Sequence, residues 1–272
     1  MLVAGIDIGA GNTKTLLMDE EGKVLGKDIR KTRADFEGCA RDSLTGALQN
    51  AGYRREEVTY IATTGLGRYS FSERDIQITD LTTTGRGSYN LFPQSGFVLD
   101  MGYQSTRAIR LWKEGRVREF HVNTKCAAGS GAFLQRAAQY LEIPLEEMGS
   151  LSMKAKTPQT ISSVCAVLAE TEIINHLADG KSVEDILRGV HISLAQRALG
   201  QLKRVGLNGE IVFVGGVTLQ EGMVDTLKEI SGVPVLVPEE PQFVAALGAA
   251  LLGWQRLKEK ERSTAEAQRM QS

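Results

Sequence analysis

The sequence predicts an α/β protein made of two related lobes that face each other across a cleft. The main observation is an internal repeat: Asp100-x-Gly102 follows Asp7-x-Gly9 by 93 positions, and later matches keep that spacing. The further matched pairs are Thr13 and Thr106, Lys14 and Arg107, Glu21 and Glu114, Gly22 and Gly115, and Val24 and Val117. In a chain with 29 glycines a single Asp-x-Gly arises easily by chance, but a series at one spacing does not.

Each copy of the repeat predicts three strands. An apolar run leads into Asp-x-Gly, a β-rich run follows, the Glu-Gly pair predicts a tight turn, and a third strand returns. Other elements then complete the first lobe. They are a helix over residues 35–50 that stops at Gly52, a buried strand Val58–Thr63 and a short helix Asp80–Phe92.

The second lobe is expected to be richer in helices. Its predicted elements are the helices Ala132–Leu141, Val164–Leu177 and Val183–Val205, the buried strand Ile211–Val214, and a helix that starts at Pro241. Ser182 is the expected N-cap of the third helix, with acidic residues in its first turn.

The expected organisation is a first lobe over residues 1–92, a second over 93–255 and a charged tail over 256–272. The last helix of the second lobe is expected to pack back on the first lobe. Beyond Trp254 the chain carries almost no core residues, so a frayed, solvated end is favoured over a docking tail.

Bulk composition excludes several classes of function. A net charge of −1 gives no electrostatic reason to expect nucleic acid or an anionic membrane as a partner. The N-terminus lacks the basic region and cleavage site of a signal peptide, and no apolar run is long enough to span a bilayer. The sequence therefore predicts a cytoplasmic protein with no membrane and no nucleic-acid partner.

Cysteine and histidine are sparse. Cys39, Cys126 and Cys165 are too few and too widely spaced for a disulfide framework, which leaves reduced thiols or metal ligands. The three histidines have no zinc-like spacing and are interpreted as ordinary core or surface residues: His121, His176 and His191.

The first Asp-x-Gly loop has the composition of a phosphate site. Glycine lets backbone N–H groups approach phosphate oxygens, so the loop is expected to bind a nucleotide through Gly9, Ala10, Gly11, Asn12, Thr13 and Lys14. Lys14 would supply a point charge, and Asp7 would hold Mg²⁺ or its water shell. No Walker loop occurs.

The second loop is the expected counterpart of the first. Asp100 would orient a water molecule or the metal, and Gly215-Gly216-Val217, between a strand and a helix, would pack against adenosine. For either loop alone a plain hairpin turn is the better interpretation. The glycine pair Gly215-Gly216, found in addition to the two loops, is what favours a nucleotide site.

These motifs resemble a known superfamily. VAGIDIGAGNTKTLL, FVLDMGYQSTRAI and IVFVGGV look like the two phosphate motifs and the adenosine motif of the actin-like (ribonuclease H-like) superfamily, which includes sugar kinases and heat-shock chaperones. KCAAGSGAFL and SSVCAVLAETEII more closely resemble the BadF/BadG/BcrA/BcrD-type ATPases, which activate 2-hydroxyacyl-CoA dehydratases or belong to benzoyl-CoA reductase. The resemblance covers roughly Leu2 to Trp254.

The resemblance implies that Cys126 and Cys165 ligate one [4Fe–4S] cluster shared across the two-fold axis of a homodimer. The cysteine count agrees: a cubane usually needs four thiolates, and two identical chains supply two each. Cys126 precedes a predicted helix and Cys165 lies at the start of another, and helix N-termini favour thiolates. Cys39 is then a plain core residue. The alternative, two buried apolar cysteines, is the commonest fate of a cytosolic Cys.

The resemblance also implies a mechanism. ATP binding would close the lobes and move the cluster-bearing helices, and an electron would pass to a partner iron–sulfur enzyme: a 2-hydroxyacyl-CoA dehydratase, a benzoyl-CoA reductase-like enzyme or a double-cubane protein. Ferredoxin or flavodoxin would resupply the electron. The expected catalytic residues are Asp7, Asp100 and Gln104. The further expected cofactor-binding residues are Gly102, Tyr103, Gly129, Gly131 and Glu170, the last at the ribose unless it lies on a solvated helix face.

The chain departs from the family in the second phosphate motif. Tyr103 stands where glycine is expected and Ser105 where a carboxylate is expected, which affects the expected hydrolysis rate or partner. Two other functions remain open. One is a small-molecule, sugar-type kinase with Asp100 as its base, and the other is a nucleotide-gated scaffold protein.

Overall fold

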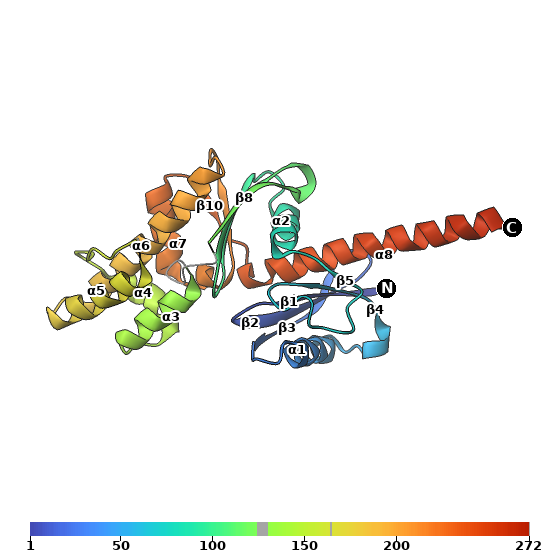
Figure 1. Cartoon of the computed structure of the whole chain (residues 1–272), viewed down its shortest axis with the longest axis horizontal. Helices are drawn as coiled ribbons and strands as arrows, with labels where there is room; N and C mark the ends of the chain where they lie inside the picture. The colour runs from blue at the N-terminus through green and yellow to red at the C-terminus, as the bar shows by residue number, and fades with distance from the viewer. Residues whose placement is uncertain (124–129, 164, 272) are drawn as a thin grey trace. The chain divides into compact units, whose positions relative to one another are not determined.

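The computed structural model describes residues 1–123, 130–163 and 165–271 (Figure 1). Contacts divide the chain into two compact units. The first unit combines residues 1–91 and 114–116 with the chain from Phe243 onward, and the second holds residues 92–113 and 117–242. The C-terminal helix therefore belongs to the first unit, whereas the sequence placed its start in the second lobe.

The first unit is built on a five-stranded sheet in the order β3-β2-β1-β4-β5. Its strands are β1 (Leu2–Ile8), β2 (Asn12–Met18), β3 (Val24–Lys31), β4 (Val58–Thr64) and β5 (Ile76–Gln77). β1 pairs antiparallel with β2 and parallel with β4. Every residue of β1 is buried because both faces of the sheet are covered, which explains its nearly continuous apolar sequence.

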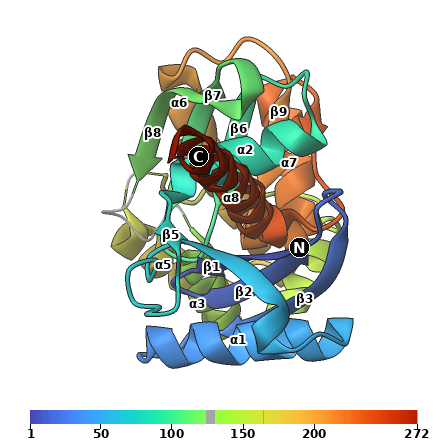
Figure 2. The same ribbon diagram turned by 90° about the vertical axis from the view of Figure 1, so that its right-hand side faces the viewer.

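Helices cover the two faces of this sheet, as Figure 2 shows. Helix α1 (Phe36–Ala51) packs its apolar stripe on one face, begins with Asp35 accepting from the Gly38 amide at 2.9 Å, and ends at the left-handed Gly52. Helix α8 (Val244–Gln271) lies on the other face, and α2 (Asp80–Leu91) packs against α8. A short 3₁₀ turn, Arg55–Glu57, precedes β4.

The C-terminal segment differs from the frayed tail that the sequence predicted. The helix α8 continues unbroken from Val244 to Gln271. Leu257 is buried in a cluster with Val3 and Tyr60, and Arg256 pairs with Glu259 at 2.8 Å. Good helix formers and such pairs extend the helix after its core contacts end.

The second unit repeats the topology of the first. Its sheet has the order β10-β9-β6-β7-β8 and consists of β6 (Phe97–Met101), β7 (Thr106–Leu111), β8 (Val117–Asn123), β9 (Ile211–Val214) and β10 (Val235–Leu236). β6 pairs antiparallel with β7 and parallel with β9. Asp7 lies opposite Lys14 and Asp100 lies opposite Arg107, so the sequence repeat corresponds to a structural repeat in register.

Helices pack on the second sheet around a larger core. They are α3 (Gly131–Tyr140), α4 (Met148–Ser152), α5 (Ala166–Ala178), α6 (Val183–Arg204) and α7 (Glu221–Ser231). Among the described residues beyond β7, 3₁₀ turns lie at Lys113–Gly115, Leu145–Glu147, Gly216–Leu219 and Pro241–Phe243. Ser182 caps α6 as predicted, since its hydroxyl accepts from the Asp185 amide at 3.2 Å. Within the described ranges no helix is long and apolar enough to cross a membrane.

Candidate functional site

The loop between β1 and β2 carries the first predicted site residues. Asp7 is the penultimate residue of the buried strand β1, and Lys14 faces it from β2 with its Nζ atom 2.8 Å from Asp7 Oδ2. The Gly9 amide donates to the Asn12 carbonyl at 3.2 Å and closes the loop. Lys14, expected as a phosphate ligand, thus forms an ion pair with the expected metal ligand.

The loop between β6 and β7 has the same geometry. Arg107 Nη1 lies 2.8 Å from Asp100 Oδ2, and the Gly102 amide donates to the Ser105 carbonyl at 3.0 Å. The side chains of Asp7 and Asp100 are each 11% exposed. Each unit therefore presents a nearly buried carboxylate beside a cation from the next strand. Gln104 is exposed in the second of the two loops.

A glycine lies directly beside each of these carboxylates. The sequence motifs identified Gly215 but not Gly65. Gly65 follows β4 with φ +86°, and Gly215 follows β9 with φ +91°. A Cβ atom at Gly65 would lie 2.5 Å from Asp7 Oδ1, and one at Gly215 would lie 2.6 Å from Asp100 Oδ1. Both positions need glycine because of the backbone angle and because of the close approach. Gly65 lies in the Thr-Gly-Leu-Gly run after β4, a turn signal that could have identified it.

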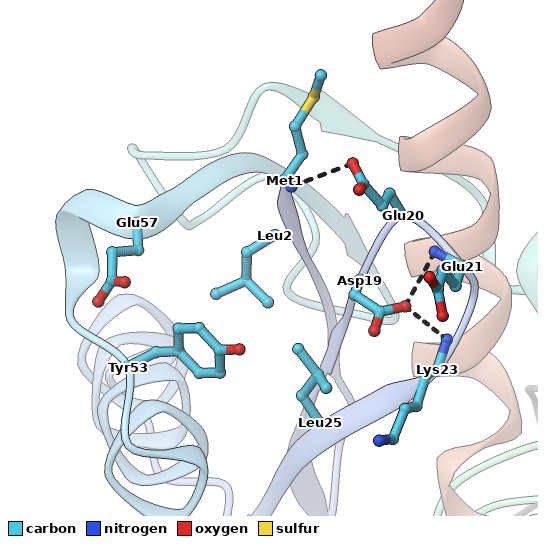
Figure 3. A pocket seen from close by; sticks show the side chains of 9 residues that line it. All are labelled: Met1, Leu2, Asp19, Glu20, Glu21, Lys23, Leu25, Tyr53 and Glu57. Atoms are coloured by element: carbon cyan, nitrogen blue, oxygen red, sulfur yellow. Dashed lines mark hydrogen bonds and ion pairs between the residues drawn. The ribbon is translucent and has the colours of Figure 1, made fainter.

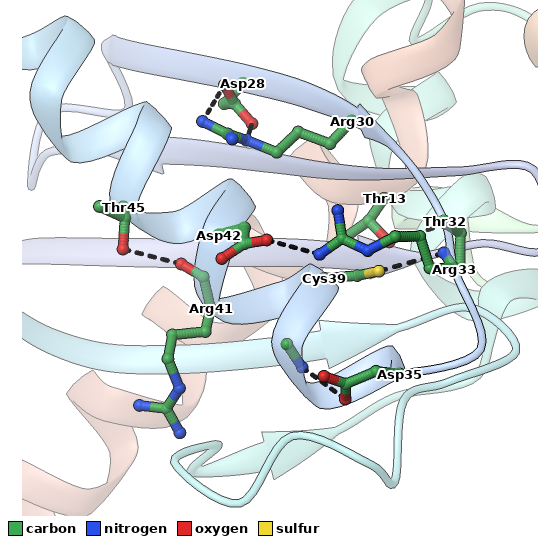
Figure 4. A network of polar contacts seen from close by, with 11 residues as sticks. Thr13, Asp28, Arg30, Thr32, Arg33, Asp35, Cys39, Arg41, Asp42 and Thr45 are labelled. Carbon is green, nitrogen blue, oxygen red and sulfur yellow. Dashed lines mark hydrogen bonds and ion pairs between the residues drawn. The ribbon is translucent and has the colours of Figure 1, made fainter.

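Polar contacts behind the first loop hold it in place (Figure 4). The Thr32 amide donates to the Gly11 carbonyl at 2.9 Å, and the hydroxyls of Thr32 and Thr13 are 2.8 Å apart. Next to Thr32, the Arg33 amide donates to Cys39 Sγ at 3.1 Å. Cys39 is buried, as predicted for a core residue, and its sulfur also supports the segment that braces the loop.

Several predicted cofactor-binding residues meet in the second unit. The amides of Gly131 and Ala132, at the start of α3, donate to the carbonyls of Gly102 and Tyr103 at 2.9 and 2.8 Å. A Cβ atom at Gly131 would lie 3.5 Å from Val217 Cγ2. The Tyr103 side chain is exposed, and a Cβ atom at Gly216 would meet no atom within 4 Å. Gly129 lies outside the described residues.

Cys165 occupies the N-terminus of a helix. It is the N-cap of α5 and is only partly buried. Hydrogen bonds from the backbone amides of Leu168 and Val167 lower the pKa of its thiol, and the positive charge of Arg197 adds to that effect. These donors favour a thiolate, the form that ligates iron. The second predicted ligand, Cys126, lies outside the described residues.

Glu170 lies on α5 but contacts α3. Its Oε1 accepts from Arg136 Nε at 2.6 Å and its Oε2 accepts from the Tyr140 hydroxyl at 3.1 Å. Both carboxylate oxygens therefore have protein partners. A ribose contact, one of the two roles that the sequence left open for Glu170, would require one of these oxygens to give up its partner.

A cavity of about 370 Å³ lies elsewhere on the first unit (Figure 3). It is lined by Met1, Leu2, Asp19, Glu20, Glu21, Lys23, Leu25, Tyr53 and Glu57. Leu2 and Asp7 are at opposite ends of β1, so at about 3.3 Å per residue the cavity is roughly 15 Å or more from the Asp7 carboxylate. The acidic lining also disfavours phosphate, so this cavity is not the nucleotide site.

Comparison with known proteins assigns the family. The sequence model of the BadF/BadG/BcrA/BcrD ATPase family matches residues 4–253. This chain belongs to that family. It is 36% identical to the activator of lactoyl-CoA dehydratase from Anaerotignum propionicum, over 96% of this chain and 100% of that protein. It is 40% identical to a subunit of benzoyl-CoA reductase from Thauera aromatica, over 93% of each.

A solved structure agrees with this assignment. The activator of the 2-hydroxyisocaproyl-CoA dehydratase from Clostridium difficile, with bound ADPNP, matches with a TM-score of 0.92 and 33% identity, covering 97% of this chain and 98% of that chain. The predicted family, the duplicated actin-like α/β fold and the assignment as an ATPase are therefore confirmed, and ATP binding follows from them. The kinase alternative is weaker, because the match to activators runs along nearly the whole of this ATPase.

Proposed function

We propose that this chain is an ATP-dependent activator that transfers a low-potential electron from a [4Fe–4S] cluster to a partner iron–sulfur enzyme. The partner would be a 2-hydroxyacyl-CoA dehydratase, a benzoyl-CoA reductase-like enzyme or a double-cubane protein. The observation that carries the proposal is the Cys165 thiol at the N-terminus of α5, in a chain whose relatives are dehydratase activators and a reductase subunit.

Each hairpin carries proposed nucleotide contacts. The carboxylate of Asp7 suits Mg²⁺, which prefers oxygen ligands, and the glycine at position 65 leaves space beside Asp7 Oδ1. Lys14 would exchange its pair with Asp7 for a phosphate oxygen once the metal neutralises the carboxylate. Asp100 and Gln104 would orient the attacking water. The remaining proposed nucleotide contacts are Gly9, Ala10, Gly11, Asn12, Thr13, Gly102, Tyr103, Gly129, Gly131, Gly215, Gly216 and Val217.

The cysteine environment fits an iron–sulfur cluster. Cys165 is partly exposed, faces two backbone amides and has a thiol pKa below its usual range, so it can serve as an anionic ligand. The cluster would supply one-electron chemistry at low potential. Cys126 of the same chain would be the other ligand.

A homodimer would complete the ligand set. One chain has three cysteines, and one of them, Cys39, is buried in the first unit. Helix α5 exposes four large apolar side chains beyond Cys165: Val167, Leu168, Ile174 and Leu177. A second copy of this chain is the proposed occupant of this apolar surface, because it would also bring the two thiols that a four-iron cluster still lacks. We further propose a ferredoxin or flavodoxin as electron donor and a cytoplasmic location.

The test is anaerobic purification followed by iron, sulfide and subunit analysis. We expect about four irons per two chains, with dimers that lose both iron and colour in Cys126→Ser and Cys165→Ser. Cys39→Ala is the matched control and should keep its iron. A colourless protein that phosphorylates a sugar would refute the proposal in favour of a kinase, and ATP binding without turnover at any redox state would favour a scaffold.

A further inference from the structure

Helices α3 and α5 are joined by a compact polar contact. Arg136 Nε on α3 donates to Glu170 Oε1 on α5 at 2.6 Å, and the Tyr140 hydroxyl donates to Oε2 at 3.1 Å. The side chains of Arg136 and Glu170 are only 34% and 19% exposed. Partial burial reduces solvent screening, so this pair constrains the two helices more than a surface pair would.

The start of α3 is fixed to the second phosphate hairpin. The amides of Gly131 and Ala132 donate to the carbonyls of Gly102 and Tyr103, and a Cβ atom at Gly131 would be 3.3 Å from the Gly102 carbonyl oxygen. The helix therefore abuts the hairpin backbone directly. A displacement of the hairpin must move the first turn of α3 or break both hydrogen bonds.

Helix α5 has few apolar anchors of its own. Of the side chains described on it, Ala169 and Ile173 are the ones buried in the core of the second unit. Glu172 and His176 bond to Ser162 and to the Thr160 carbonyl, which belong to the segment before α5 rather than to α3. Among the described residues, α5 is therefore hydrogen-bonded to α3 through Glu170, which accepts from Arg136 and Tyr140.

We propose that Arg136 and Glu170 are positioning residues that transmit the nucleotide state of the second hairpin to Cys165. The path runs from the carbonyls of residues 102 and 103 through α3 and the ion pair into α5, whose N-cap is Cys165. It lies entirely within the second unit. The inference rests on the proposed function, since it gives the coupling between ATP and the cluster a physical route.

An ion pair suits this role better than an apolar contact. Side chains in an apolar interface slide over one another at little cost, whereas a directional hydrogen bond between charged groups fixes one position. Arginine is also the more suitable cation, because its planar guanidinium holds a fixed geometry that a lysine ammonium does not.

The test compares the single variants Glu170→Gln and Arg136→Gln with the charge-reversed pair Arg136→Glu/Glu170→Arg. The control is Glu229→Gln, which removes a more exposed carboxylate paired with Arg188 between α6 and α7 of the same unit. One readout is the change in cluster midpoint potential on adding Mg·ADP. The other is hydrogen exchange of the first-turn amides of α5 with and without Mg·ADP. Nucleotide affinity and iron content are measured in parallel.

We expect Glu170→Gln to keep its iron and its nucleotide affinity within about twofold, and to lose more than about half of both nucleotide-induced changes. The reversed pair should recover most of the loss, and Glu229→Gln should behave as wild type. A full nucleotide response in Glu170→Gln would overturn the inference. So would a nucleotide affinity weakened about tenfold in Glu170→Gln and unchanged in Arg136→Gln, because Glu170 would then bind the ribose. A wild-type protein without iron would refute the proposed function, while hydrogen exchange would still test the ion pair.

Discussion

The buried histidine of the second unit should make the protein lose stability in mild acid. His191 is completely buried between α4, α6 and α7, with Nδ1 2.9 Å from Ser152 Oγ. Ser152 donates its own hydroxyl proton to the Gly149 carbonyl at 2.8 Å, so Nδ1 must be the donor to Ser152. Nε2 has no hydrogen-bond partner within the described ranges. The ring is therefore held neutral.

The size of the effect follows from the pKa. Burial, with a smaller contribution from Arg188, lowers the pKa of His191 to about 3. In the unfolded chain the pKa is about 6.5, so between these values the unfolded state binds more protons than the folded state. The contribution of neutral His191 to the free energy of unfolding is fully present above about pH 6.5 and is lost as the pH falls toward the folded-state pKa. The loss from this one group is about 2 kcal/mol at pH 5 and about 5 kcal/mol below pH 3.

The assay is anaerobic urea unfolding at pH 7.5 and pH 5.0, following the transition of the second unit. His191→Leu should lose about 2 kcal/mol less than wild type between the two pH values, whatever its stability at pH 7.5. His176→Gln, at the end of α5, is the matched control for the loss of a histidine. If the free energy of unfolding falls equally in wild type and His191→Leu between pH 7.5 and pH 5.0, His191 is not neutral in the folded protein and the reasoning fails.

Other predictions test the hairpins and the α5 surface. Gly65→Ala should lower the free energy of unfolding by about 1–3 kcal/mol and weaken nucleotide binding in calorimetry, because its Cβ would clash with Asp7. The control Gly52→Ala has a similar φ but open space around it, so it should lower the free energy of unfolding by about 1 kcal/mol and leave nucleotide binding unchanged. Thr32→Val should raise the Kd for ATP about threefold to tenfold because it orphans a buried hydroxyl of the first loop. Thr32→Ser should restore binding, and equal Kd values for the two variants would contradict the bracing role. Ile174→Ser should weaken dimerisation about tenfold in analytical ultracentrifugation, and an unchanged dimer would exclude α5 from the interface.

The repeated hairpins were predictable because strand pairing preserves the spacing of the motif. Asp7 and Asp100 are the penultimate residues of equivalent strands, so one offset places both carboxylates in equivalent positions. The ion pair of Asp7 with Lys14 was not foreseen. It depends on the register across the hairpin, which places Lys14 opposite Asp7 rather than in the loop.

Features that depend on distant segments were harder to predict. Gly65 is the counterpart of Gly215, but each glycine reaches its carboxylate through parallel pairing with a strand far away in the sequence. The role of Glu170 also depends on tertiary structure, because its partners Arg136 and Tyr140 are 34 and 30 residues earlier. A helix was expected after Gly215-Gly216-Val217, but its bounds were not predicted, although α7 has a clear apolar stripe.

The discontinuous first unit has a consequence for biosynthesis. Its sheet is made by the first 91 residues, but one face is covered by α8, which begins at Val244. At about 5–20 residues per second, the ribosome takes on the order of ten seconds to add the intervening chain. Residues such as Leu16 and Met18 therefore stay uncovered while the second unit, nearly continuous in sequence, is being synthesised. The nascent first unit should thus be a substrate for chaperones until translation ends.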